Sequence, residues 1–172
     1  MQVTIPTLRT ERLDLVPPHH SHLTTYEVLY GSPEIMRHIA EPLDKQATAR
    51  LLAAHAGSWA LHGFGGWCVE ELATRAVIGI AGLNRLEQGG DVEVGWIIEP
   101  SAWGRGYATE AARAVIQYAF EQVGALRAVA HIARENAGSI AVARKLGMQI
   151  DQEAAIGTKL VFVRNREEPI DA

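Results

Sequence analysis

The chain has 172 residues, a formal net charge of −4 and 48% hydrophobic residues. This length predicts one domain, residues 1–172, and the mild negative charge gives no basic field for binding nucleic acid or an acidic membrane surface. No apolar run approaches the roughly 20 residues that span a bilayer. A single cysteine excludes an internal disulfide framework, and the first residues lack the pattern of a secretory signal, so we expect a cytoplasmic protein.

Hydrophobic patterning predicts a mixed α/β chain, because segments of period two alternate with segments of helical spacing. The clearest boundaries are an N-cap at Asp44 and a glycine stop at Gly63. The expected elements, in chain order, are a strand at 12–16, helical pieces at 20–30 and 33–39, a helix at 44–63, strands at 64–70, 77–83 and 92–98, a helix from 107, a strand at 128–132, a helix at 137–146 and strands at 149–154 and 159–164.

The glycine turn between the strand at 92–98 and the helix from 107 predicts a phosphate site. Residues 103–111 read W-G-R-G-Y-A-T-E-A. A helix that opens from such a turn presents free N–H groups and the positive end of its dipole. No P-loop pattern is present, and Thr109 stands where a dinucleotide fingerprint needs a third small residue. The remaining interpretation is the turn that holds the pyrophosphate of an acyl-coenzyme A. The competing interpretation is an ordinary strand-to-helix loop.

Two further blocks accompany the turn. Residues 7–13 read T-L-R-T-E-R-L, and residues 135–148 read E-N-A-G-S-I-A-V-A-R-K-L-G-M after a short apolar strand. Together the three blocks resemble the GNAT superfamily of N-acetyltransferases. More narrowly, they resemble the branch that contains the ribosomal-protein N-terminal (alanine/serine) acetyltransferases. The resemblance spans residues 7 to 148, and none of its motifs identifies the substrate.

The resemblance implies a single α/β (α+β) domain with a mixed, mostly antiparallel sheet and flanking helices. One parallel pair, the strands at 92–98 and 128–132, would splay apart near the reaction centre, and a bulge at Gly95-Trp96 would be a physical cause. Acetyl-CoA would be the cosubstrate, with its pantetheine arm paired to main-chain groups in the gap. The residues expected to bind it are Trp96, Ile97, Ile98, Trp103, Gly104, Arg105, Gly106, Tyr107, Ala108, Thr109, Asn136 and Ser139. The Arg105 side chain is a further candidate for contacting phosphate.

Two side chains of the 135–148 block carry the expected chemistry at the thioester. Asn136 would contact the pantetheine arm, although it also fits the simpler role of helix N-cap. Many family members have a tyrosine that protonates the leaving thiolate, and Ala143 occupies that position here. This departure puts Ser139 forward as the hydrogen-bond donor to the departing sulfur.

The amine acceptor must lose a proton before it attacks, so a carboxylate base is expected. Glu93 is the first candidate, because strand alternation places it on the face of Gly95 and Ile97. An exposed strand residue is the alternative for Glu93, and Glu110 and Glu70 are weaker candidates. His131 either faces the acceptor pocket or has a structural role.

The sequence as a whole favours an acetyl-CoA-dependent N-acetyltransferase that works by direct transfer in a ternary complex. Its acceptor is open between a protein N-terminus and a small amine such as a polyamine, an amino acid or an antibiotic. A non-catalytic acyl-CoA-binding module that senses its ligand is the alternative, and a nucleotide-binding regulator is a third possibility. We expect no metal, since the histidines at 19, 20 and 22 lack companion ligands, and a homodimer is the assembly expected on symmetry grounds.

Overall fold

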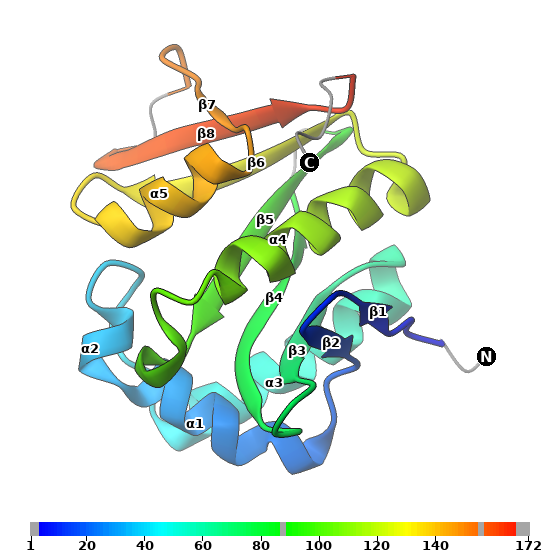
Figure 1. Ribbon diagram of the computed structural model, residues 1–172, viewed down its shortest axis with the longest axis vertical. Coiled ribbons are helices and arrows are strands. Elements are labelled where there is room, and N and C mark those ends of the chain that lie inside the picture. The colour runs from blue at the N-terminus through cyan, green and yellow to red at the C-terminus, as the bar shows by residue number, and fades with distance from the viewer. Residues whose placement is uncertain (1–3, 87–88, 155–156, 168–172) are drawn as a thin grey trace.

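The computed structural model describes residues 4–86, 89–154 and 157–167. Its centre is an open eight-stranded sheet of order β1-β2-β3-β4-β5-β6-β8-β7 (Figure 1). The strands are β1 Leu8–Arg9, β2 Leu13–Val16, β3 Gly66–Glu71, β4 Val77–Arg85, β5 Asp91–Ile98, β6 Arg127–Ala133, β7 Gln149–Ile150 and β8 Lys159–Asn165. All neighbouring strands run antiparallel except β5 and β6. The expected mixed, mostly antiparallel sheet with one parallel pair is therefore confirmed.

The helices cover the two faces of this sheet. They are α1 Leu23–Gly31, α2 Pro33–Met36, α3 Lys45–His62, α4 Tyr107–Tyr118 and α5 Ala137–Lys145, with short 3₁₀ turns at His20–His22 and Pro100–Ala102 and a π turn at Ala119–Val123. In Figure 1, α4 crosses the near face of the sheet and α5 lies beside β6. The ends of α3 are as expected, because Asp44 Oδ1 accepts from the Ala47 N–H at 2.7 Å and Gly63 adopts a φ of 77°.

Strand β5 divides its side chains between two buried clusters. Val92, Val94 and Ile98 belong to the cluster that includes the buried residues of α4. Ile97 belongs to the cluster formed with α1, α2 and α3. Since side chains alternate along a strand, Glu93 lies on the face of Ile97, as the sequence predicts. Each fully buried aliphatic side chain of this kind contributes about 1.5–3 kcal/mol to folding.

The parallel pair separates after a short stretch. Strands β5 and β6 are paired only from Asp91↔Arg127 to Glu93↔Val129. Beyond this point β5 stays with β4 as far as Ile98, and β6 stays with β8 as far as Ala133. The expected splay is confirmed, but the expected bulge at Gly95-Trp96 is wrong, because the β4–β5 register is continuous there. Each strand keeps its antiparallel partner, so the two halves of the sheet diverge without an extra residue.

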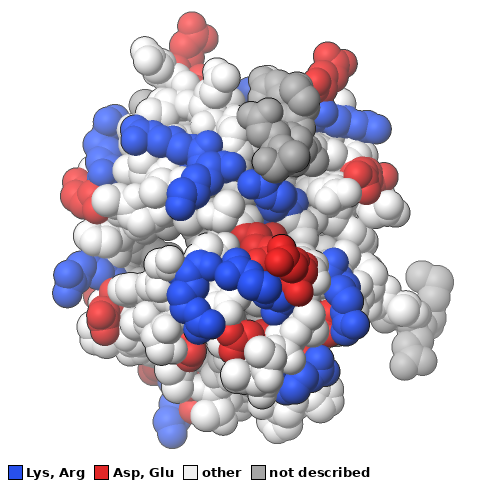
Figure 2. Space-filling view, in the orientation of Figure 1, with Lys and Arg blue, Asp and Glu red and all other residues white. Residues whose placement is uncertain are grey.

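The surface carries both signs of charge. On the face shown in Figure 2, Lys and Arg side chains are interspersed with Asp and Glu side chains. Within the described ranges, no helix combines the length and apolar character that crossing a membrane requires.

Candidate active site

The turn before α4 presents backbone donors to one spot. Gly104 and Gly106 both adopt left-handed backbone conformations, with φ of 73° and 81°. The helix has no side-chain cap at Gly106, and its first helical bond runs from the Glu110 N–H to the Gly106 carbonyl at 3.0 Å. The N–H groups of residues 107, 108 and 109 therefore have no partner within the helix. Such a helix start is suited to bind a phosphate group.

Residues 7–13, the N-terminal strand block, contact this turn and the first turn of α4. Glu110 Oε1 accepts from the Thr10 hydroxyl at 2.6 Å and from the Arg12 N–H at 2.8 Å. The Arg12 guanidinium donates from Nε to Glu110 Oε2 at 2.7 Å and from Nη1 to the Arg105 carbonyl at 2.9 Å. Burial works to raise the pKa of Glu110, but the bonds from Thr10 and Arg12 outweigh it and hold that pKa below its usual value. Sequence reasoning missed this contact, although the T-L-R-T-E-R-L block was its visible signal.

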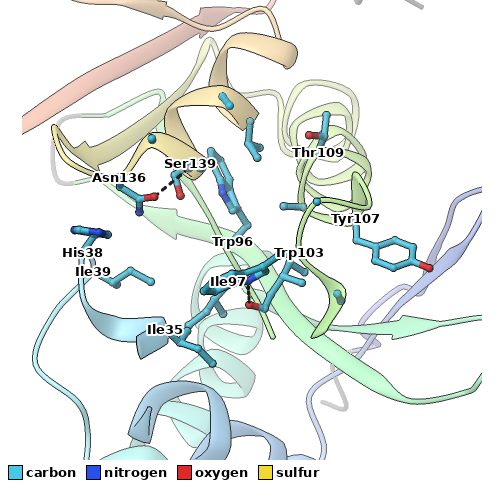
Figure 3. A pocket seen from close by; sticks show the side chains of 18 of the residues that line it. Ile35, His38, Ile39, Trp96, Ile97, Trp103, Tyr107, Thr109, Asn136 and Ser139 are labelled. Atoms are coloured by element: carbon cyan, nitrogen blue, oxygen red, sulfur yellow. Dashed lines mark hydrogen bonds between the residues drawn. The ribbon is translucent and has the colours of Figure 1, made fainter. Parts of the chain in front are cut away.

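The side chains of Arg105 and Tyr107 are held by Glu71 on β3. The Tyr107 hydroxyl donates a short hydrogen bond to Glu71, and Arg105 Nη2 lies 3.1 Å from Glu71 Oε1 and 2.9 Å from the Tyr107 oxygen. The Tyr107 bond lowers the pKa of Glu71. In Figure 3 Tyr107 points away from the other labelled residues. In this structure the Arg105 side chain forms an ion pair with Glu71, and its contact with phosphate stays a prediction.

A cavity of about 620 Å³ extends from this turn to the start of α5. It is lined by every residue expected to bind the cofactor except Arg105, and also by residues from the end of α2 that the sequence did not single out (Figure 3). Its volume lies within the roughly 300–1,000 Å³ typical of small-molecule sites. The expected cofactor residues that line it are Trp96, Ile97, Ile98, Trp103, Gly104, Gly106, Tyr107, Ala108, Thr109, Asn136 and Ser139.

The edge of β5 in the gap offers main-chain groups to this cavity. The Glu99 N–H donates to the Ile78 carbonyl at 2.9 Å, which continues the β4–β5 ladder. Hydrogen-bonding directions alternate along an antiparallel strand, so the main chain of Ile97 points to β4 and that of Trp96 and Ile98 points to the gap. The Ile98 carbonyl accepts from Trp103 Nε1 at 2.6 Å. The main-chain groups available to a ligand are therefore those of Trp96 and the N–H of Ile98.

A second cavity, of about 190 Å³, brings the candidate catalytic residues together. Glu93, His131 and Ser139 all line it. Glu93 Oε1 lies 2.6 Å from His131 Nδ1, and Asn84 Nδ2 donates to Glu93 Oε2 at 3.4 Å. The sequence alone did not decide whether His131 faces the acceptor pocket or has a structural role. The pairing of Glu93 with Val129 across β5 and β6 explains its position, because His131 is the next residue on that face of β6.

Asn136 and Ser139 line both cavities. Asn136 is the N-cap of α5, and its Oδ1 accepts from the Ser139 N–H at 3.1 Å. This N-cap hydrogen bond uses the backbone N–H of Ser139 and leaves its side-chain hydroxyl available for another contact. Ala143 is fully buried in α5 and brings no hydroxyl to the site. Within the described part of the chain, no group of three or more His, Cys, Asp or Glu side chains could hold a metal ion.

The helix α4 thus opens from a glycine turn beside a splayed parallel pair, and two adjoining cavities meet at Trp96, Asn136 and Ser139. This is the arrangement that the family resemblance implies for an acyltransferase. The sequence matches the acetyltransferase (GNAT) domain family over residues 12–149. The chain belongs to this family, and it is an acetyltransferase with the single mixed α/β domain of that family.

Known proteins similar to the chain agree with this assignment. The chain is 30% identical to the FsC-acetyl coenzyme A-N(2)-transacetylase of Aspergillus fumigatus, in an alignment that covers 83% of this chain and 65% of that protein. The crystal structure of the acetyltransferase from Agrobacterium tumefaciens has a TM-score of 0.86 at 30% identity and covers 96% of this chain and 97% of its own. The ribosomal L7/L12 alpha-N-protein acetyltransferase RimL, in complex with coenzyme A, has a TM-score of 0.79 at 15% identity over 93% and 98% of the two chains. This last likeness shows the fold alone.

Proposed function

We propose that the protein transfers an acetyl group from acetyl-CoA to a primary amine by direct transfer in a ternary complex. One observation carries the proposal. The large cavity beside the turn and the small cavity that contains Glu93 share Trp96 of β5, Asn136 and Ser139 at the start of α5, and His38 and Ile39 after α2. A thioester and an amine that entered from the two cavities would meet at these shared residues. The non-catalytic module is disfavoured, because the Ser139 hydroxyl lies where the two cavities join and the Glu93 carboxylate lines the small cavity beside it.

Cofactor binding would use backbone groups. The N–H groups at the start of α4 would hold the pyrophosphate. The main-chain groups of Trp96 and the N–H of Ile98 would pair with the pantetheine arm much as an added strand does. Asn136 would contact the same arm from the start of α5. A backbone N–H in the gap would stabilise the negative charge that develops on the thioester oxygen.

Glu93 is the proposed general base. Its carboxylate would take a proton from the ammonium form of the acceptor, directly or through one water, because an alkylamine is protonated at neutral pH. The 2.6 Å contact with His131 and the amide of Asn84 orient this carboxylate. His131 is thus a positioning residue in this account.

Ser139 is the proposed donor to the leaving group. The amine nitrogen forms a bond to the acyl carbon, and the carbon–sulfur bond breaks with its electron pair going to sulfur. The Ser139 hydroxyl, which lines both cavities, would donate a hydrogen bond to this thiolate. We also propose a cytoplasmic setting, consistent with the buried free thiol of Cys68, and a homodimer as the assembly to test first.

Release of free CoA from acetyl-CoA, measured against small amines and peptide N-termini, tests the proposal. We expect acceptor-dependent release, and we expect Glu93→Gln to lower kcat by about 10²–10⁴-fold with loss of the acidic limb of the pH–rate profile. Glu167→Gln is the matched control, because Glu167 is exposed and lines neither cavity. A Glu93→Gln variant that kept the same acidic limb would remove this residue as the base.

A further inference from the structure

The charges that line the small cavity are unevenly distributed. Among the described residues that line it, Glu93 is the one carboxylate, and it already contacts His131 and Asn84. The other ionisable side chains that line it are basic: His38, His131 and Lys159. The acceptor side of the site is therefore not a generally acidic environment, although its substrate is a cation.

Lys159 lines this cavity, and it has no ionic partner among the residues that the structure describes. It is the first residue of β8 and lies directly opposite Ala133 of β6. Opposed residues share a face of the sheet, and residues two apart on a strand do so as well, so Lys159 and His131 lie on one face. Among the ion pairs of residues 4–86, 89–154 and 157–167, none involves Lys159. A half-buried cation lining a ligand site is stabilised when the ligand supplies an anion.

We propose that the acceptor is a small primary amine that carries a carboxylate, the class to which free amino acids belong. This inference rests on the proposed acetyltransferase function and specifies its substrate. The amine end would face the Glu93 carboxylate, and the carboxylate end would bind the Lys159 ammonium. Lys159 is then a residue that determines acceptor specificity.

The same features disfavour the other acceptors. A polyamine would bring a second positive charge toward Lys159 and the two histidines. A peptide N-terminus has the amine that would face Glu93. Its first residue, however, carries an uncharged amide in place of the carboxylate that would bind the Lys159 ammonium. A single lysine suits a carboxylate better than a phosphate, which proteins more often bind through several donors.

Steady-state CoA release with matched acceptors tests this inference. The panel holds the common L-amino acids, the amide and the decarboxylated amine of each, spermidine and a short neutral peptide. We expect the best amino acid to exceed its own amide in kcat/KM by at least about tenfold, because a charge-assisted contact is lost in the amide. Lys159→Met should raise KM for that amino acid by a similar factor, leave its kcat nearly unchanged and leave the amide unaffected. Lys45→Met is the matched control, since Lys45 is exposed at the start of α3 and lines neither cavity.

The outcomes separate this inference from the function on which it rests. If amines are acetylated but each amino acid is no better than its amide or its decarboxylated amine, the assignment of the acceptor class is overturned and the acetyltransferase stands. Acetylation confined to spermidine or to the peptide overturns it in the same way. If Lys159→Met lowered kcat/KM equally for an amino acid and for its amide, the effect would be structural. That result would contradict a contact between Lys159 and the acceptor carboxylate. If nothing in the panel or among other peptide N-termini releases CoA, the proposed function fails first.

Discussion

Replacing Arg12 by glutamine tests whether the N-terminal strand block sets the conformation of the phosphate turn. In the native chain, Arg12 Nη2 lies 2.7 Å from Glu110 Oε2, and its Nη1 donates to the Arg105 carbonyl at 2.9 Å. The guanidinium also lies 4.5 Å from the centre of the Tyr107 ring. The Arg12→Gln variant would lose the positive charge, and its shorter side chain would not reach the three partners. It would keep the backbone N–H that donates to Glu110.

The expected loss of stability in Arg12→Gln depends on how exposed the Arg12 and Glu110 side chains are. The Arg12 side chain is 42% exposed and that of Glu110 is 16% exposed, so solvent screens the ion pair and it contributes at most about 1 kcal/mol. The bond to the Arg105 carbonyl and the ring contact add about 1 kcal/mol each at the upper end, and the contributions are not additive. We expect the free energy of unfolding to fall by about 2 kcal/mol. If about 1.4 kcal/mol of this appears as a loss of preorganisation of the turn, KM for acetyl-CoA rises about tenfold.

Steady-state kinetics and denaturant unfolding on the same variants separate the loss of stability from the rise in KM for acetyl-CoA. We expect kcat to be nearly unchanged, because the turn holds the cosubstrate equally in the ground and transition states. A double-mutant cycle with Glu110→Gln should show coupling between the two positions in acetyl-CoA affinity. Arg9→Gln is the control, since it removes a 2.6 Å ion pair with Asp14 on the neighbouring strand and leaves the turn untouched. If the KM for acetyl-CoA changed no more in Arg12→Gln than in Arg9→Gln, Arg12 would not set the conformation of the phosphate turn.

Three further predictions concern single positions. Gly106→Asp should abolish binding of acetyl-CoA while far-UV circular dichroism shows the fold intact, because it places a charge and a side chain at the phosphate turn and strains a φ of 81°; normal binding would make the pyrophosphate assignment wrong. Ser139→Ala should lower kcat with little change in the affinity for acetyl-CoA, since the N-cap bond to Asn136 uses the backbone; an unchanged kcat would return Ser139 to a structural role. Burial lowers the pKa of His55 from its usual 6.5 to about 4, so the folded state binds fewer protons than the unfolded state and stability is lost as pH falls from 6.5 toward 4. His55→Asn should flatten this part of the stability–pH curve, and a curve of the same slope would show that His55 does not cause it.

The sequence predicts the parts of the site that depend on local pattern. The turn at Gly104 and Gly106 was recognisable because a strand, two glycines and a helix follow one another directly in the chain. The face of Glu93 followed from strand alternation alone. Asn136 was expected as an N-cap from its residue type and its place before a helical pattern, and the structure shows that cap. The splay of β5 and β6 came only from the family resemblance.

The parts that the sequence did not predict depend on contacts between distant segments. Arg12 and Glu110 are separated by 98 residues, and Glu93 and His131 by 38, so their pairing required the strand order of the sheet. The bulge near Gly95 was expected because an extra residue bends a strand locally, whereas the divergence lies between the two halves of the sheet. The contact between Arg105 and Glu71 on β3 was not predicted either, because the two residues are 34 positions apart in the chain.

Every proposed role assumes that acetyl-CoA occupies the large cavity, so its binding is the first property to measure. Trp96 and Trp103 line that cavity, so tryptophan fluorescence reports on its occupancy, and thermal shift gives an independent reading. We predict saturable binding of acetyl-CoA and CoA, and no competition from ATP or NAD. If the protein failed to bind acetyl-CoA, or if ATP or NAD displaced it, the glycine turn would not be an acyl-CoA site and the proposed function would be wrong.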